Sequence, residues 1–273
     1  MRSPLSLLPI LALCYAVVGT TLAESRAVQG HTTATLSAQY DRIDGHSPFW
    51  VLFRLDIQPG WHTYWKNPGD AGLAPALHWT LPPGATASEI AWQPPRREPF
   101  GPLLGYVYEG SAYHLVKITP PPGGIARGKF PLKVEATWLV CDEECVPEKA
   151  CLDLPLPVGD KNVPSPQDEA IRKLLATATP EPLPILTVKS DSAALVLTVP
   201  LTPAKAIQDA YFYPDTAGVI EPAAKQEARI ANDVLTLTLK RGLIPVPTPL
   251  AGLLEIDDAD GTHFYSLTQP ATP

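Results

Sequence analysis

The stretch Phe49-Trp50-Val51-Leu52-Phe53-Arg54-Leu55-Asp56-Ile57 decides the fold class. Its odd-numbered residues are all apolar, whereas Arg54 and Asp56 interrupt the other series. Because side chains alternate between the two faces of a strand, this pattern predicts a β-strand with one buried face. Similar short runs, separated by Gly and Pro, cover residues 33–40, 76–81, 111–118, 132–140 and 151–158. Their spacing predicts an antiparallel β-sandwich from His31 to about Pro157.

A second series of predicted strands follows in the C-terminal part. These runs cover residues 185–188, 194–199, 210–213, 234–239, 250–257 and 262–267, and their span of about 85 residues suits a small sandwich. Between the two series, Ser165, Pro166 and Asp168 have the types preferred at the N-cap, N1 and N3 positions of a helix running to about Ala178. We therefore predict an all-β chain in which two β-sandwich domains, 24–160 and 183–273, are joined by a short helical linker over 161–182.

The composition indicates a globular protein and excludes several partners. Of 273 residues, 45% are hydrophobic and 18% are charged, so the chain can bury a sizeable core. The 33 prolines fix φ and remove backbone donors, which disfavours long helical bundles. Lys and Arg number 21 against 28 Asp and Glu, and no basic run occurs. We therefore expect no nucleic-acid partner.

The first residues predict export. After Arg2, an apolar run from Leu5 to Leu22 ends in Thr21-Leu22-Ala23, whose small first and third residues fit a signal-peptidase site. We therefore expect residues 1–23 to be a cleavable signal peptide. No later stretch approaches the ~20 apolar residues of a membrane-spanning helix, so we expect no membrane span in the mature chain.

Two cysteines fall at a predicted hairpin tip. Cys141-Asp142-Glu143-Glu144-Cys145 follows a predicted strand, and we expect Val146-Pro147 to turn the chain back toward a strand starting near Cys151. At such a tip the two Cα atoms can approach within the roughly 4.4–6.8 Å that a disulfide needs. A bridge over so short a loop stabilises the fold by only about 2 kcal/mol, which suits a bond that opens and closes.

Other roles for the cysteines stay open at this point. A Cys141–Cys145 bridge can be purely structural, as most disulfides of secreted proteins are. The Cys-x3-Cys-x5-Cys spacing is not a common zinc pattern, and the sole methionine is the initiator, so we expect neither a metal nor another cofactor. Cys151 is interpreted as a small buried hydrophobe, with pairing to Cys145 or Cys141 as the alternative.

Three further candidates have simpler structural interpretations. The cluster Trp61-His62-Thr63-Tyr64-Trp65 has the aromatic content of a sugar-binding platform, but such residues at strand ends are more typical of a core. His62, His78 and His114 are scattered, without a carboxylate pair or a Gly-x-Ser-x-Gly motif for a hydrolase. Asp257-Asp258-Ala259-Asp260-Gly261 lacks the rest of an EF-hand loop and is interpreted as a hairpin turn.

Three sequence blocks carry a resemblance to a known family. They are Gly60-Trp61-His62-Thr63-Tyr64-Trp65-Lys66-Asn67-Pro68-Gly69-Asp70-Ala71-Gly72, Gly105-Tyr106-Val107-Tyr108-Glu109-Gly110 and Trp138-Leu139-Val140-Cys141-Asp142-Glu143-Glu144-Cys145-Val146-Pro147-Glu148. With these blocks in this order, residues 31–160 resemble the N-terminal periplasmic domain of the DsbD/ScsB family of thiol:disulfide interchange proteins. The remaining residues look like the rest of the exported portion in the ScsB-like branch.

The resemblance implies a periplasmic immunoglobulin-like sandwich that exchanges electrons through a cysteine pair. Cys141 and Cys145 become the redox pair, and Cys145 becomes the sulfur that forms the mixed disulfide with a partner. In the best-known branch an aromatic residue caps the pair; the match here is Phe100, with Tyr106 and Tyr108 as rivals. The cysteine spacing is shorter here than in that branch.

Two function classes follow from these observations. In the first, the protein is a thiol:disulfide interchange component that passes electrons to oxidised periplasmic proteins. Because the sequence shows no cofactor motif, we expect its electrons to come from outside, from a thioredoxin-like protein or a membrane thiol carrier. In the second, it is a non-catalytic periplasmic β-sandwich, a binding or structural module with a fixed disulfide.

Overall fold

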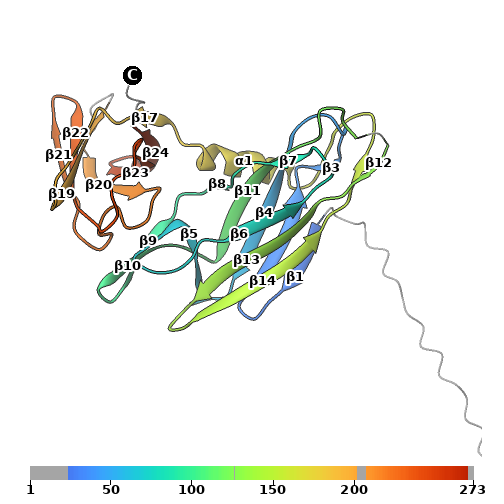
Figure 1. Cartoon of the computed structure of the whole chain (residues 1–273), viewed down its shortest axis with the longest axis horizontal. Helices are drawn as coiled ribbons and strands as arrows, with labels where there is room; N and C mark the ends of the chain where they lie inside the picture. Colours follow the sequence, from blue (N-terminus) through green and yellow to red (C-terminus); the bar gives the residue numbers. More distant parts are fainter. Residues whose placement is uncertain (1–23, 126, 202–206, 270–273) are drawn as a thin grey trace, which may run out of the picture.

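Two antiparallel sheets face each other in the first sandwich, residues 24–164 (Figure 1). The computed structural model describes residues 24–125, 127–201 and 207–269, so the expected signal peptide lies outside the described residues. One sheet, here the helix-side sheet, has the order β1 (Glu24–Val28), β2 (Thr32–Ala38), β4 (Phe49–Ile57), β11 (Ser111–Thr119) and β7 (Thr86–Ala87), with β8 (Ala91–Trp92) also paired to β11.

The other sheet, here the cysteine sheet, carries both candidate cysteines. Its order is β14 (Cys145–Asp153), β13 (Lys133–Cys141), β5 (His62–Gly69), β10 (Leu103–Glu109) and β9 (Arg96–Phe100), with β6 (Ala76–Thr80) also paired to β13. Two short pairs complete the first sandwich: β3 (Tyr40–Arg42) with β16 (Val163–Pro164), and β12 (Gly128–Phe130) with β15 (Leu156–Val158).

The core of the first sandwich is built by alternating residues of both sheets. Phe49, Val51, Phe53 and Leu55 of β4 are all buried, as their spacing predicts. Phe53 packs against Trp138 of β13, with ring centroids 5.9 Å apart. Burying one such side chain stabilises the fold by roughly 1.5–3 kcal/mol, so these positions hold the two sheets together.

The helix α1 (Asp168–Ala178) lies on the outer face of the helix-side sheet. Its Ile171 is fully buried and packs with Leu52 of β4 and Leu115 of β11. These two residues belong to the face of their strands that points away from the core, so the sheet is covered on both sides. The predicted linker helix is therefore docked on the first sandwich. The domain boundaries expected from the sequence stay predictions.

The start of α1 differs from the prediction. The helix begins at Asp168, and its N-cap residue Gln167 makes no side-chain capping bond. Ser165 is not the N-cap: its hydroxyl donates to the carbonyl of Ala38 (2.6 Å) and accepts the N–H of Gln167 (3.1 Å). The Ser165 side chain thus bonds to the end of β2, and the helix begins only three residues later.

The second sandwich, residues 182–268, contains two four-stranded sheets. One has the order β17 (Pro182–Pro184), β24 (Gly261–Thr268), β23 (Ala251–Asp258) and β20 (Ile207–Pro214), and the other has the order β18 (Thr187–Ser190), β19 (Ala194–Pro200), β22 (Val234–Lys240) and β21 (Glu227–Ala231). Alternation along β20 sends Phe212 into the core of the second sandwich, while Tyr211 and Tyr213 join the core of the first. The all-β prediction of two sandwiches is confirmed.

Several strand predictions in the first sandwich were incomplete. The sequence pattern predicts no strand at 62–69, 96–100 or 103–109, where β5, β9 and β10 lie. The turn predicted at Val146-Pro147 is wrong, because both residues lie within β14, which starts at Cys145 itself. Pro and Gly interrupt each of these stretches, and they hide a strand pattern at positions where the sheet has an irregular register or an open edge.

Both outer strands of the cysteine sheet contain a proline. β14 carries Pro147 and β9 carries Pro99. Proline is tolerated at such edges, where the missing N–H would face solvent.

No helix in the described residues is long and apolar enough to cross a membrane.

The buried imidazole of His114 predicts an acid-sensitive fold. Complete burial lowers its pKa from 6.5 to about 4, against a weak contact with the Phe53 carbonyl. The unfolded chain therefore binds a proton below pH 6.5 that the folded chain refuses, so stability is full above that pH and falls as the pH drops toward 4. We expect a loss of about 2 kcal/mol in unfolding free energy between pH 7 and pH 5.

The measurement is urea unfolding at both pH values for the wild type and for His114→Phe. The variant removes the titrating group while keeping a ring among Phe53, Trp92 and Tyr108. Between pH 7 and pH 5, the variant should lose about 2 kcal/mol less unfolding free energy than the wild type. If His114→Phe folds poorly, His114→Gln provides the same comparison. An equal pH dependence in wild type and variant contradicts the assignment.

Candidate functional site: the disulfide hairpin

The hairpin between β13 and β14 ends in a disulfide. Cys141 closes β13, Cys145 opens β14, and the two residues face each other in the strand register with Cα atoms 4.1 Å apart. The three residues between them, Asp142, Glu143 and Glu144, form the tip, where the Asp142 N–H donates to the Glu144 carbonyl (3.1 Å). The structure therefore bonds the two predicted site cysteines to each other at the end of a long hairpin.

The two sulfur-bearing residues differ in accessibility. Cys141 is 1% exposed and forms a buried cluster with Tyr64 and Val107, against which the partly buried Phe100 packs. Cys145 is exposed. Because thiol exchange requires direct approach to a sulfur atom, an incoming thiolate reaches Cys145 more readily than Cys141.

Strand β5 places two polar aromatic side chains beside the disulfide. His62 pairs with Cys141 in the sheet, and Tyr64 lies two residues further on the same face. The Tyr64 hydroxyl is 3.9 Å from Cys145 Sγ and 3.1 Å from His62 Nε2. The Tyr64 hydroxyl therefore lies between the His62 imidazole and the Cys145 sulfur and contacts both.

Both side chains are held in their neutral forms. Burial raises the pKa of Tyr64. Burial also lowers the pKa of His62, although the carboxylates of Glu109, Glu98 and Asp142 oppose this shift. At pH 7 the Tyr64 hydroxyl is therefore protonated and can donate to a thiolate on Cys145, which stabilises that thiolate.

Phe100 lies over this group of residues. Its ring stacks on His62, with centroids 4.7 Å apart and planes 22° apart. The ring also lies against Gly105: a Cβ at Gly105 would stand 2.6 Å from Phe100 Cε2. Only glycine leaves room for the ring at this position, so Gly105 fixes how closely Phe100 approaches the sheet.

The two rival cap residues lie on the other face of β10. Tyr106 is fully buried, and its hydroxyl is 2.8 Å from that of Tyr211 in the second sandwich. Tyr108 donates its hydroxyl to the Gln93 carbonyl (2.6 Å). Alternation along β10 points Val107 toward the disulfide and both tyrosines away from it. The structure brings Phe100, and neither tyrosine, to the cysteine pair.

The sequence-based interpretation of Cys151 is wrong. Cys151 is a free, exposed cysteine on β14, whereas the sequence interpretation made it a buried hydrophobe or a disulfide partner. The alternation of β14 buries Glu148, Ala150 and Leu152 and turns Cys145 and Cys151 to the opposite face. Glu148 is accommodated in the buried series because it accepts bonds from the His31 N–H, the Thr32 hydroxyl and the Trp138 indole.

The remaining candidates take structural positions. Trp65 packs between Tyr106 and Tyr213, so that part of the aromatic cluster is core. The acidic turn at 257–261 joins β23 to β24 as a hairpin, as predicted. The residues that the structure describes contain no group of three or more His, Cys, Asp or Glu side chains suited to a metal.

The fold and the site together define a two-sandwich protein with a disulfide at a hairpin tip, in which Cys145 is exposed and Cys141 is buried. Residues 29–157 match the family model of the thiol:disulfide interchange protein DsbD, N-terminal. That part of the chain therefore matches the DsbD N-terminal domain family, and the resemblance stated from the sequence is confirmed.

One solved structure supports the fold. The N-terminal periplasmic domain of ScsB from Proteus mirabilis superposes with a TM-score of 0.65 over 92% of this chain and 100% of that chain, at 17% sequence identity. A chimeric titin Z1Z2 aligns over 90% of this chain and 100% of that chain at 12% identity, but its TM-score of 0.22 carries no weight. No curated protein sequence matches the chain.

His62, Tyr64 and Gly105 were not singled out for the site by the sequence. They lie inside the blocks that carry the family resemblance, but the strands that bring them to the disulfide were not predicted. If 62–65 is treated as a strand, alternation places His62 and Tyr64 on one face and Thr63 and Trp65 on the other. This pattern could have identified His62 and Tyr64 as neighbours in the site.

We expect Phe100→Ala to expose the disulfide. Removing the ring opens the side of the pair covered by the cap, so reduction by dithiothreitol should become about fivefold faster, because access to sulfur limits exchange. The measurement is the pseudo-first-order rate of reduction, with the melting temperature as a check on folding. Tyr108→Phe is the matched control, since it alters an aromatic on the opposite face. Equal rates for wild type and Phe100→Ala would show that Phe100 does not shield the pair.

Proposed function

We propose that this protein is a periplasmic thiol:disulfide exchange module. It takes electrons from a thioredoxin-like or membrane-embedded thiol carrier and passes them to oxidised periplasmic proteins through Cys141 and Cys145. The observation that carries the proposal is the asymmetric disulfide at the hairpin tip, with one sulfur exposed and the other buried, within a DsbD N-terminal domain.

The exchange is written as two thiolate displacements. A donor thiolate attacks Cys145 Sγ, so a bond forms between the donor and Cys145 and the Cys141–Cys145 bond breaks, with the electron pair leaving on Cys141. The donor's second thiolate then attacks the donor sulfur that is bonded to Cys145, and Cys145 is released as a thiolate. Two electrons have moved to the module, the donor is a disulfide, and each module sulfur takes a proton from water. The reverse sequence reduces an oxidised client.

The surroundings of the pair control when this happens. Asp142, Glu143 and Glu144 disfavour a thiolate by like-charge repulsion, whereas the Tyr64 hydroxyl can stabilise one on Cys145. The Phe100 ring packs against the cluster formed by Cys141, Tyr64 and Val107. A partner with a basic rim would complement the acidic tip and displace the ring, so exchange is favoured after docking.

The cellular location rests on two supports. The expected signal peptide directs the chain out of the cytoplasm. The similar ScsB domain is described as periplasmic. An oxidising compartment suits a protein whose cysteine pair is a disulfide.

A trapping experiment tests the roles of the two sulfurs. All variants carry Cys151→Ser, because the exposed Cys151 thiol would react as well. The probe is a thioredoxin with its buried cysteine changed to serine and its remaining cysteine activated with Ellman's reagent. Cys141→Ser should form the mixed disulfide at least about tenfold faster than Cys145→Ser, since the exposed thiol is the better nucleophile. Equal rates would refute the assignment of Cys145 as the attacking sulfur.

The reduction potential separates the proposed module from a fixed bridge. We expect the Cys141–Cys145 couple to equilibrate with glutathione or thioredoxin at a potential between about −180 and −270 mV, the range of exchanging pairs. The measurement is redox titration of the Cys151→Ser protein, with alkylation to count thiols. A value below about −300 mV marks an inert structural disulfide. That outcome would favour the non-catalytic binding or structural module.

A further inference from the structure

The β9–β10 hairpin has two faces with different neighbours. Arg97 and Tyr106 are opposite each other in the register of the two strands. Both reach the second sandwich, where each contacts Tyr211. Phe100 and Gly105 belong to the alternate face, where Phe100 packs against the cluster that contains Cys141. One short hairpin therefore connects the second sandwich on one side with the cap of the cysteine pair on the other.

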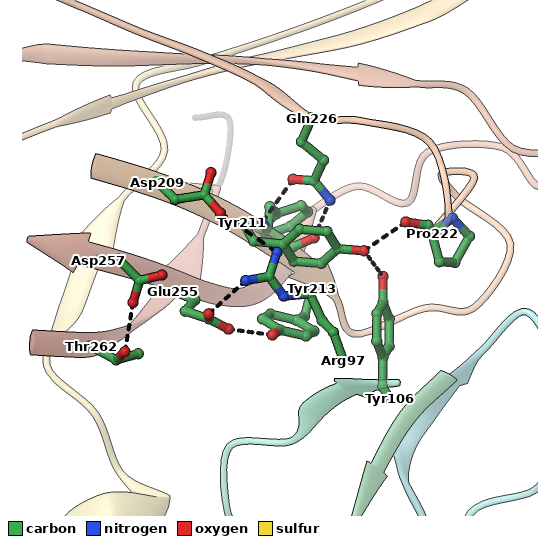
Figure 2. Close-up of polar contacts among 11 residues, drawn as sticks. Arg97, Tyr106, Asp209, Tyr211, Tyr213, Pro222, Gln226, Glu255, Asp257 and Thr262 are labelled. Atoms are coloured by element: carbon green, nitrogen blue, oxygen red, sulfur yellow. Dashed lines mark hydrogen bonds and ion pairs between the residues drawn. The ribbon is translucent and has the colours of Figure 1, made fainter. Parts of the chain in front are cut away.

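Arg97 is held by the second sandwich through charge and an aromatic face. Its guanidinium donates to Glu255 (2.9 Å) and lies 3.7 Å from Asp209 (Figure 2). The guanidinium carbon also lies 4.5 Å from the centroid of the Tyr211 ring. The Glu255 side chain is only 12% exposed, so this ion pair is partly shielded from water and stronger than an ordinary surface pair.

Tyrosine hydroxyls extend the same contact. The Tyr211 hydroxyl donates to the Pro222 carbonyl (2.9 Å) and meets Tyr106 Oη, while Tyr213 donates to the Glu255 carboxylate (Figure 2). Burial raises the pKa of Tyr211 to about 12, so its hydroxyl stays protonated and the bonds persist at neutral pH. The contact set is satisfied on both sides and holds Arg97 in one place.

Strand β10 is bonded to the first sandwich, through β5 and through the Leu104 backbone to Asp70, whereas β9 has less support. β9 is the edge strand of the cysteine sheet and, in the described part of the chain, pairs only with β10. The pairing of β10 with β5 is itself interrupted by a register irregularity between Gly105 and Val107. An edge strand beside an irregular pairing opens easily unless a neighbour holds it. Here the neighbour is the second sandwich.

We propose that the second sandwich positions the cap of the redox site through Arg97. The Arg97–Glu255–Tyr211 contact holds β9, and β9 holds Phe100 over the cysteine pair, so the contact sets the rate of thiol exchange at Cys145. Arg97 acts through Phe100 and is a positioning residue. This inference deepens the proposed function and rests on it for its biological meaning.

The test compares variants that loosen the contact from the far side. Glu255→Gln removes the charge that holds Arg97, and Tyr211→Phe removes the hydroxyl that meets Tyr106. Asp215→Asn is the matched control: it breaks the Lys66–Asp215 ion pair (2.6 Å), which also joins the two sandwiches but does not touch β9. Each variant is made alone and together with Phe100→Ala, in the Cys151→Ser protein.

The readout is the rate at which dithiothreitol reduces the disulfide, with the melting temperature recorded for every variant. Glu255→Gln and Tyr211→Phe should each accelerate reduction roughly fivefold, because charge-assisted and buried hydrogen bonds are lost, while Asp215→Asn changes it less than about twofold. In the Phe100→Ala protein the same substitutions should have no further effect, since the cap that they position is gone.

Two results would overturn the inference. One is an unchanged rate for both contact variants. The other is equal acceleration with and without Phe100, which a general loosening of the fold would produce. The chemical reductant reads the cap whether or not the pair exchanges with proteins. A potential below about −300 mV would therefore reject the proposed function but would not affect the outcome of this test. If the variants fail to change the reduction rate as expected, the result of the trapping experiment still stands.

Discussion

Each side chain of the cysteine sheet must point either into the core or to the opposite surface, and the site depends on this constraint. In β13, Trp138 and Val140 build the core while Leu139 and Cys141 lie on the outer face. In β5, Trp65 is directed inward while Tyr64 lies beside the sulfur. One sheet thus supplies both stability and chemistry. A shift of register by one residue would exchange the two sets, so the packing of Trp138 also fixes the place of the disulfide.

The sequence predicted the parts of the fold in which apolar alternation is uninterrupted. Strand β4 appears where Phe49 to Ile57 predicted it, and the cysteine pair lies at a hairpin tip. Cys151 was misjudged because apolar neighbours suggested burial, while the period of β14 turns it to solvent. Tyr106 and Tyr108 competed with Phe100 only because no strand was predicted at 103–109, and without a strand their face is undefined. Contacts between the sandwiches, such as Tyr106 with Tyr211, carry no local sequence signal.

The two sandwiches are joined by more than a linker. Tyr211, Tyr213 and Leu253 belong to the hydrophobic core of the first sandwich, and the Asn67 side chain donates to the Pro214 carbonyl (2.7 Å). Contacts of this kind resist independent motion of neighbouring domains. The helix α1 adds to the same result, because it binds the first sandwich along its apolar stripe before the chain enters the second. The cysteine hairpin therefore belongs to one continuous framework.

The prolines at the two edges of the cysteine sheet bear on how an extended segment of another protein can meet this sheet. An unfolded segment readily extends an open sheet by adding a strand. Pro99 in β9 and Pro147 in β14 each remove a backbone donor from the edge strand that such a segment would join. Under the proposed function, a client that reaches Cys145 would therefore meet side chains and no continuous row of backbone donors, and it could leave once its disulfide is reduced.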